Sequence, residues 1–388
     1  MPSEQLFGSN GGAGHGKVGI NAHLLSSEAG YRRAGIHQYI AQVLRHLPWE
    51  EGEPTTVVFT QQKKLFEDLP GITAVSSRLA TQNRLLRILW EQVVWPWQAR
   101  QHSLALLHSM AFVTPLLATC PTVITVYDLS FYHFPERFPA LQRLYLSSQT
   151  RRSCQRARRI ITISESSRQD VHRFLGVPLS QIDVVVPGVD RVYQPLPAAQ
   201  VSAFRQKQGV ARFVLHVGTL QPRKNIPVLL KAMARLDDPA IKLVLVGGKG
   251  WLYDDIFQQV QALGLAERVI FTGYVPDDDL PLWYNAAELL VFPSVYEGFG
   301  LPVVEAMACG TPVIAANSSS LPEAVGDAGL LFAPSDVETL ANQMTAVLTD
   351  INLQNKLRQQ GLAHAQTFSW ERAGRETAAV YKRALLNQ

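Results

Sequence analysis

Short apolar runs rich in β-branched residues alternate along this chain with longer amphipathic stretches, and this alternation limits the fold more than any other feature. The runs are bounded by Gly, Pro or Asp, as buried parallel strands are. Parallel strands need helical crossovers that cover both faces of the sheet, so the pattern predicts a doubly wound α/β fold. The strands that we expect span 18–22, 56–60, 122–126, 160–163, 182–186, 212–217, 242–246, 269–272, 289–292 and 311–315.

The length of 388 residues suits two domains of ordinary size. The boundary is expected at 193–200, which reads Tyr-Gln-Pro-Leu-Pro-Ala-Ala-Gln, because two prolines interrupt both helices and central strands. The predicted strands divide evenly around it. This predicts a flexible tail over 1–16 and two Rossmann-like halves over 17–195 and 196–368. Ligands of such sheets bind beyond the carboxyl ends of the strands, so we expect the site between the halves.

Composition favours a protein of the cytoplasm without a membrane-spanning helix. No apolar run reaches the roughly 18 residues that such a helix needs, and the first 16 residues lack the apolar segment of a signal peptide. The three cysteines, Cys120, Cys154 and Cys309, are widely spaced and odd in number. This indicates neither a disulfide framework nor a zinc site.

Positive charge is concentrated in the first half, where residues 1–195 carry 20 Lys and Arg against 14 Asp and Glu, compared with 16 against 18 in the remainder. An anionic partner, such as acceptor phosphates or a membrane surface, explains this as well as a solvated basic face does. The apolar segment 85–97 is flanked by Arg84 and Arg100. We favour a helix packed on the N-terminal sheet, and the alternative is an interfacial helix of a protein bound peripherally to the inner face of the membrane. No nucleic-acid partner is expected.

The strongest functional pattern lies in 291–315, which reads Val-Phe-Pro-Ser-Val-Tyr-Glu-Gly-Phe-Gly-Leu-Pro-Val-Val-Glu-Ala-Met-Ala-Cys-Gly-Thr-Pro-Val-Ile-Ala. A buried strand ends, a glycine-rich turn follows, and a helix begins near Pro302. The amides of Phe299, Gly300 and Leu301 would then lie at the positive end of that helix. They form a binding site for a diphosphate or a sugar hydroxyl.

Two glutamates, Glu297 and Glu305, lie eight residues apart on this turn and helix. One can bind the sugar end of a ligand and the other its ribose. Glu305 stands among apolar neighbours, so its burial predicts that a ligand hydroxyl satisfies it. Two adjacent cations, Arg223 and Lys224, follow the strand 212–217 and can neutralise a diphosphate, both bound and leaving. An exposed pair of loop residues is the alternative.

These segments resemble the E-x7-E motif of retaining GT-B glycosyltransferases, and beyond the tail the chain is similar to glycosyltransferase family 4. The resemblance implies the GT-B fold, with a C-terminal helix over 369–388 that crosses back to the N-terminal domain. In the family the first glutamate, here Glu297, contacts the donor sugar, and the second, here Glu305, holds the ribose hydroxyls. Glu297, Asp128 and Lys224 are therefore the expected catalytic residues.

The resemblance also implies donor contacts at the strand ends of the second half, at Gly218, Thr219, Gly248 and Val275. The backbone near Val275 would read the nucleotide base, and structural turn glycines are the alternative reading of the glycine loop. Family members usually carry an arginine where this chain has Thr219, so Arg223 is expected to substitute for it.

On the N-terminal side, Gly35 at a helix start permits close approach of a donor phosphate. Tyr127 and Asp128 follow the strand 122–126. Many family members carry a histidine where this chain has Tyr127, which leaves the usual assignment of the acceptor side open. Asp128 is expected to position the acceptor hydroxyl. His108 is an acceptor candidate too, with a structural histidine as the alternative.

The resemblance favours front-face substitution, in which the leaving diphosphate accepts the acceptor proton. Because cations take the place of a metal, neither a metal nor another cofactor is expected. Similarity to bacterial polysaccharide mannosyltransferases places GDP-mannose first as donor and a UDP-sugar second, with a glycan or lipid-linked sugar as acceptor. The alternatives are a GT-B phosphorylase and, in view of Tyr127, a catalytically silent subunit that binds a nucleotide-sugar.

Overall fold

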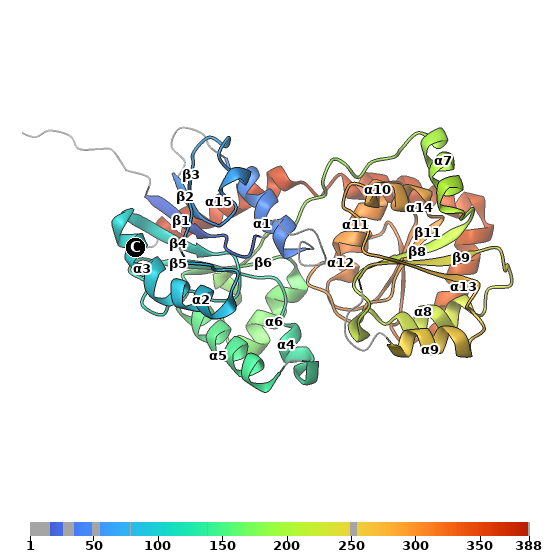
Figure 1. The fold of residues 1–388 in the computed structure, drawn as a ribbon, viewed down its shortest axis with the longest axis horizontal. Coiled ribbons are helices and arrows are strands. Elements are labelled where there is room, and N and C mark those ends of the chain that lie inside the picture. Colours follow the sequence, from blue (N-terminus) through green and yellow to red (C-terminus); the bar gives the residue numbers. More distant parts are fainter. Residues whose placement is uncertain are drawn as a thin grey trace, which may run out of the picture.

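The computed structural model describes residues 16–25, 35–48, 55–77, 79–137, 139–248 and 254–386. The predicted tail lies outside these ranges except for Gly16. Figure 1 shows two α/β lobes side by side, the first in blue to green and the second in green to red. Both sheets are parallel throughout, because every strand is joined to the next by a crossover connection. The predicted fold class, two doubly wound Rossmann-like domains, is confirmed.

The N-terminal sheet has the strand order β3-β2-β1-β4-β5-β6-β7. The order reverses between β1 and β4, which makes the carboxyl ends of these two strands the switch point where ligands bind in such sheets. The strands are β1 (Lys17–Asn21), β2 (Thr56–Phe59), β3 (Ile72–Val75), β4 (Leu104–Ser109), β5 (Thr122–Val126), β6 (Arg159–Thr162) and β7 (Ile182–Val184). The helices are α1 (Ile36–Arg45), α2 (Arg84–Leu89), a π-helical turn (Trp90–Val94), α3 (Trp95–Gln101), α4 (Ser130–His133), α5 (Ala140–Arg156) and α6 (Glu165–Leu175), with short 3-10 turns between them.

The C-terminal sheet has the order β10-β9-β8-β11-β12-β13, with its own reversal between β8 and β11. Its strands are β8 (Phe213–Val217), β9 (Lys242–Val246), β10 (Val269–Gly273), β11 (Leu289–Phe292), β12 (Val313–Ala316) and β13 (Leu330–Phe332). The helices are α7 (Ala198–Gln208), α8 (Ile226–Met233), α9 (Asp254–Ala262), α10 (Leu280–Ala286), α11 (Leu301–Ala308), α12 (Leu321–Val325), α13 (Val337–Thr349) and α14 (Ile351–Ala365).

The last helix, α15 (Trp370–Leu386), returns from the C-terminal lobe and lies against the N-terminal one (Figure 1). Its buried face carries Trp370 and Tyr381, which belong to the apolar core that β1 and α1 form. A Cβ atom on Gly374 would collide with the backbone carbonyl of His46, so the backbone of α15 packs directly against the end of α1 there. The helix thus joins the two lobes through the N-terminal core.

Three strands were not predicted, β3, β4 and β13. The most important is β4, which lies at the centre of its sheet. It was missed because its sequence Leu-Ala-Leu-Leu-His-Ser fits a helix as well as a strand. The turn before β4 contains Ser103, which adopts a left-handed φ of 52°. A glycine at this position would have signalled the turn, but the sequence has a serine there.

Candidate active site

The functional pattern around Glu297 folds into a compact ionic cluster at the carboxyl ends of β8 and β11. The Glu297 carboxylate accepts hydrogen bonds from Lys224 Nζ and from Arg223 Nη1, each at 2.6 Å. Arg223 also donates to the backbone carbonyl of Tyr296. Lys224 is 6% exposed and Glu297 9%, so the cluster is almost closed to water.

Burial and charge act in opposite directions on this cluster. Burial alone would raise the pKa of Glu297, but the charges of Arg223 and Lys224 outweigh it and hold this pKa at about 2. Burial lowers the pKa of Lys224 to about 8, and the carboxylate of Glu297 prevents a larger fall. At neutral pH the cluster therefore carries two cations and one anion, a net positive charge suited to a phosphate.

The turn after Glu297 leaves its amides unoccupied. Gly300 is the N-cap of α11 and adopts a φ of 112°, which favours glycine at this position. Within the described part of the chain, no hydrogen bond is donated by the amides of Phe299, Gly300 or Leu301. These amides and the helix dipole add to the positive field of the cluster.

The N-terminal domain meets this turn directly. A Cβ atom on Gly298 would lie 2.5 Å from the backbone carbonyl of Tyr127, so only glycine allows the approach. The next residue, Asp128, is close enough for its charge to stabilise the charged forms of Arg223 and Lys224. Its Oδ1 atom accepts a hydrogen bond from Ser130 N, which fixes the carboxylate at the start of α4. Tertiary structure thus brings Asp128 to the ionic cluster from the opposite domain.

Glu305 lies in a different environment from Glu297. It is 4% exposed and accepts a hydrogen bond of 2.8 Å from the Tyr284 hydroxyl of α10. Burial raises the pKa of Glu305 to about 7. The hydrogen bond from Tyr284 opposes this rise, and the charges of Asp277 and Asp190 add to it. The Tyr284 hydroxyl satisfies Oε2, so burial of Glu305 does not by itself require a ligand hydroxyl, and its contact with the ribose stays a prediction. Among the described residues, no hydrogen bond or ion pair joins Glu305 to the Glu297 cluster.

Two acceptor candidates point into the protein. His108 is buried, with Tyr381 Oη 2.7 Å from Nδ1 and Thr125 Oγ1 2.8 Å from Nε2, and burial lowers its pKa to about 3. It therefore fits the structural alternative and holds α15 to the sheet. The Tyr127 hydroxyl is likewise buried and donates to the carbonyl of Met110. Neither side chain is presented to an acceptor in this arrangement, whereas the Tyr127 carbonyl faces Gly298.

The remaining donor candidates lie at strand ends. A Cβ atom on Gly218 would lie 3.1 Å from Lys224 Cε, so this glycine leaves room for the lysine. Thr219 lies beside Gly248, whose carbonyl accepts a hydrogen bond from Leu220 N. Val275 follows β10 and packs partly on the apolar core. Gly35 caps α1 with a φ of 53°, and residues 26–34 before it and residues 249–253 lie outside the described residues.

Several polar residues of the site were not predicted. Ser319 Oγ accepts a hydrogen bond from Glu297 N, and Ser320 Oγ donates to the carbonyls of Glu297 and Phe299. A sequence signal for these residues was available, because serines at 318–320 follow the buried strand β12. Tyr296 bridges the domains: its hydroxyl donates to Asp170 Oδ2 and accepts from Leu129 N. Nothing in the local sequence marks that contact.

Two further observations concern metals and membranes. Within the described ranges, no three His, Cys, Asp or Glu side chains gather as metal ligands would. No helix in the same ranges has the length and hydropathy needed to cross a bilayer.

Two family models match the two halves of the chain. The model described as Glycosyltransferase Family 4 covers residues 33–192, and the model described as Glycosyl transferases group 1 covers residues 200–364. The O-antigen chain mannosyltransferase B of Escherichia coli is 37% identical over 371 residues, which are 91% of this chain and 97% of that protein.

Solved structures show the same fold. A sucrose-phosphate synthase from Thermosynechococcus elongatus has a TM-score of 0.76 at 22% identity and covers 96% of this chain and 100% of its own. The Anabaena protein HepE, crystallised with UDP and glucose, has a TM-score of 0.72 at 23% identity and covers 94% and 99%. With its GT-B architecture, its paired family matches and a relative aligned over nearly its whole length, the chain belongs to glycosyltransferase family 4.

Proposed function

We propose that this glycosyltransferase transfers mannose from GDP-mannose, with retention of anomeric configuration, to a glycan or lipid-linked sugar. The observation that carries the proposal is the Glu297 cluster at the open N-terminus of α11, with Asp128 facing it from the other domain. The similarity to an O-antigen chain mannosyltransferase supports mannose. A UDP-sugar is the second candidate, since HepE was crystallised with UDP and glucose.

The chemistry follows from the charges of the site. Lys224, Arg223 and the amides of the turn after Gly298 bind the donor diphosphate and stabilise the charge that develops as the sugar–phosphate bond breaks. Glu297 orients the sugar and fixes both cations. In front-face substitution the leaving diphosphate accepts the proton of the attacking hydroxyl, and Asp128 positions that hydroxyl. The two cations would neutralise the diphosphate without a divalent ion, and full activity lost only on chelation would contradict this.

The proposed place of action is the cytoplasm, with peripheral binding to the inner face of the membrane. The apolar segment 85–97 supports it: Trp90 and Trp95 are buried, as the packed-helix interpretation requires, while Leu85, Leu89, Val93 and Trp97 are exposed. An interfacial helix presents such apolar side chains beside arginines.

The donor is tested by thermal shift and turnover. GDP-mannose is expected to raise the melting temperature and to be consumed when a lipid-phosphate sugar acceptor is added, because a ligand that binds only the folded state stabilises it. UDP-glucose serves as the comparison. The proposal fails if UDP-glucose does both and GDP-mannose does neither. Donor binding without turnover would favour the silent subunit instead.

The role of Glu297 is tested with Glu297→Gln. Transfer is expected to fall by about 100-fold or more, because a transition-state contact and the anchor of Lys224 are lost. GDP affinity should fall less than transfer, since Arg223 and the amides of the turn remain to bind the diphosphate. Glu338→Gln, on the exposed side of α13, is the matched control. Equal losses of transfer and GDP affinity would contradict the assigned role.

A further inference from the structure

A pocket of about 280 Å³ opens in the N-terminal domain between α2 and α5. Asn21 at the end of β1 and Phe112 after β4 line its floor, so it lies at the switch point of the N-terminal sheet, where ligands of doubly wound folds bind. Its volume is near the lower end of the roughly 300–1,000 Å³ typical of ligand sites, which suits one sugar or sugar phosphate.

The pocket carries an excess of positive charge. Arg84 and Arg87 of α2 line it, and Arg84 lies over the ring of Tyr145 from α5, 5.7 Å from its centroid. Arg87 Nε is 3.9 Å from the carboxylate of Glu91, too far for a direct hydrogen bond. Among the described residues, Arg84 has no carboxylate partner. The guanidinium group of Arg84 is therefore available to an anion, and that of Arg87 has only a long ion pair with Glu91.

Glu91 cancels only part of this charge near neutral pH. It is buried and accepts a hydrogen bond from Asn21 Nδ2 at 3.2 Å. Burial raises the pKa of Glu91 to about 7, although Arg87 and Asn21 oppose the rise. The protonated form of Glu91 is therefore accessible near neutral pH. In that form its hydroxyl can donate a hydrogen bond to a sugar or phosphate oxygen.

One aromatic layer separates the pocket from the Glu297 turn. Phe112 packs edge-on against Tyr127, whose carbonyl faces Gly298. Phe112 adopts a φ of 49°, a strained conformation for an aromatic residue that its amide stabilises by donating to Thr125 O. Phe112 and Tyr127 thus connect the pocket to the turn that is proposed to bind the donor.

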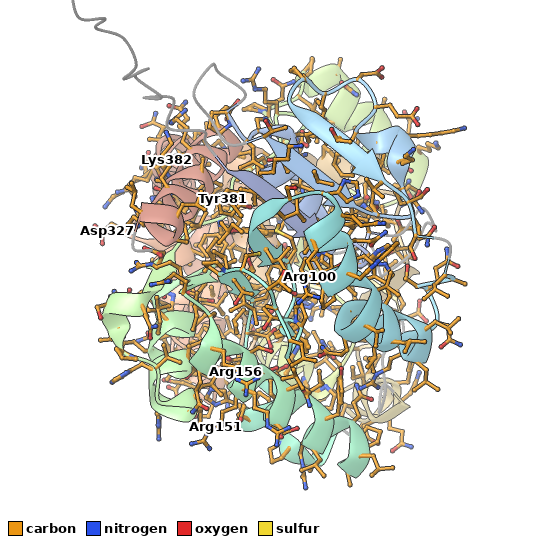
Figure 2. All side chains as sticks on the ribbon, turned by 90° about the vertical axis from the view of Figure 1, so that its left-hand side faces the viewer. Arg100, Arg151, Arg156, Asp327, Tyr381 and Lys382 are labelled. Carbon is orange, nitrogen blue, oxygen red and sulfur yellow. The ribbon has the colours of Figure 1, made fainter. Side chains whose placement is uncertain are left out.

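The two helices that border the pocket also carry exposed leucines outside its lining, here called the rim leucines. Leu85 on α2 is 76% exposed and Leu141 on α5 83%, and Leu89 and Leu144 are exposed beside them. Both helices lie on the side of the N-terminal lobe that Figure 2 faces, where Arg100 of α3 and Arg151 and Arg156 of α5 are labelled. An anionic group inside the pocket and a hydrocarbon chain across its rim would match these surfaces.

We propose that this pocket seats the phosphate through which a sugar acceptor is joined to its lipid, with Arg84 and Arg87 binding the phosphate and the rim leucines contacting the lipid chain. This deepens the acceptor class of the proposed function and rests on it. The chemistry needs both parts of the ligand: a phosphate alone leaves the rim leucines exposed, and a neutral glycolipid leaves Arg84 without an anionic partner.

The test titrates three probes by calorimetry in non-ionic micelles: hexadecyl mannosyl phosphate, hexadecyl mannoside and methyl mannosyl phosphate. The wild-type protein should bind the first most tightly. Arg84→Gln/Arg87→Gln should weaken its binding by about tenfold or more, as the loss of charge-assisted hydrogen bonds predicts, and leave hexadecyl mannoside unchanged. Arg100→Gln, on the same helical stretch but outside the pocket, is the matched control.

Three outcomes would overturn the proposal. Equal binding of the hexadecyl mannoside would exclude the phosphate, equal binding of methyl mannosyl phosphate would exclude the lipid chain, and an equal loss in Arg100→Gln would show a general charge effect. If the double variant does not fold, Gln142→Trp is the alternative test. It fills the pocket without changing a charge and should abolish binding. GDP-mannose stabilisation should be retained in all variants. If the wild type lacks it, the donor proposal fails while the probe titration still tests the pocket.

Discussion

Lys224 shows how much the surroundings of one residue set its chemistry. A solvated lysine holds its proton far above neutral pH, but this one is buried beneath the aromatic ring of Phe292, with Nζ 4.8 Å from the ring centroid, and beside Arg223. Its pKa falls to about 8, which is close to the working range of an enzyme. Glu297 is the partner that keeps it charged at neutral pH.

The pH profile should therefore report on Lys224. We expect kcat/KM for the donor to fall as the pH rises through about 8, because free enzyme with a neutral Lys224 binds the diphosphate poorly. The contribution of Lys224 to folding stability changes with pH in the opposite direction. Between pH 8 and the ordinary pKa of 10.5 the unfolded chain binds more protons, so this residue makes stability increase with pH there.

The control compares Lys224→Arg with Lys231→Arg, a change on the exposed side of α8. Steady-state rates across the pH range should show the decline moved above about pH 10 in the first variant, because arginine does not lose its proton in proteins. The second variant should keep the wild-type profile. An unchanged decline in Lys224→Arg would mean that another group titrates.

At the scale of elements, α15 is the clearest case of a helix whose position depends on one small residue. Its face toward α1 is apolar, and Gly374 brings its backbone against the carbonyl of His46. Gly188, in the segment that leaves β7, is similarly close to the backbone of Trp370. The first turns of α15 therefore pack against other backbone at two points, Trp370 and Gly374, and neither contact leaves space for a methyl group.

Gly374→Ala should reduce the free energy of unfolding by about 2 kcal/mol, because an overpacked backbone contact outweighs the higher helix propensity of alanine. Gly361→Ala in α14 is the matched control. Its new Cβ would meet the side chain of Met307 at 3.3 Å, which can adjust. Thermal and urea unfolding would measure both, and equal stability of the two variants would contradict the packing argument.

At the scale of the whole molecule, the two lobes are held together by a few polar contacts at the site. Glu323 of α12 accepts hydrogen bonds from the amides of Glu165 and Ser166, at 2.7 and 2.8 Å, and so caps α6 in the opposite domain. Ser167 Oγ donates to the carbonyl of Tyr127 and reaches the Gly298 carbonyl at 3.4 Å. A carboxylate on the positive end of a helix stabilises this arrangement of the domains.

Glu323→Ala should shift the population toward a more open arrangement, since two charge-assisted hydrogen bonds between the domains are lost. Small-angle scattering should record a larger radius of gyration, and KM for the donor should rise. Glu338→Ala, whose carboxylate lies in the first turn of α13 in its own domain, should leave both unchanged. A radius of gyration equal to that of the wild type would show that other contacts hold the lobes.

Sequence alone determined the architecture and the centre of the site. Apolar runs separated by turn residues indicated ten of the strands correctly, because a buried parallel strand has a local signature. The resemblance around Glu297 and Lys224 singled out residues that lie in one cluster, since each follows a strand and such ends share one edge of a sheet. The central strand β4 escaped because its composition also fits a helix.

Only the tertiary structure decided which partners satisfy these groups. Glu305 is paired with Tyr284 from another helix, and His108 is held by Tyr381 from the end of the chain. Asp128 reaches Arg223 across two domains, and Arg84 with Tyr145 shapes a pocket that no motif marked. The physical reason is distance along the chain: periodicity and turn chemistry act over a few residues, whereas burial, pairing and pKa depend on neighbours that folding brings together.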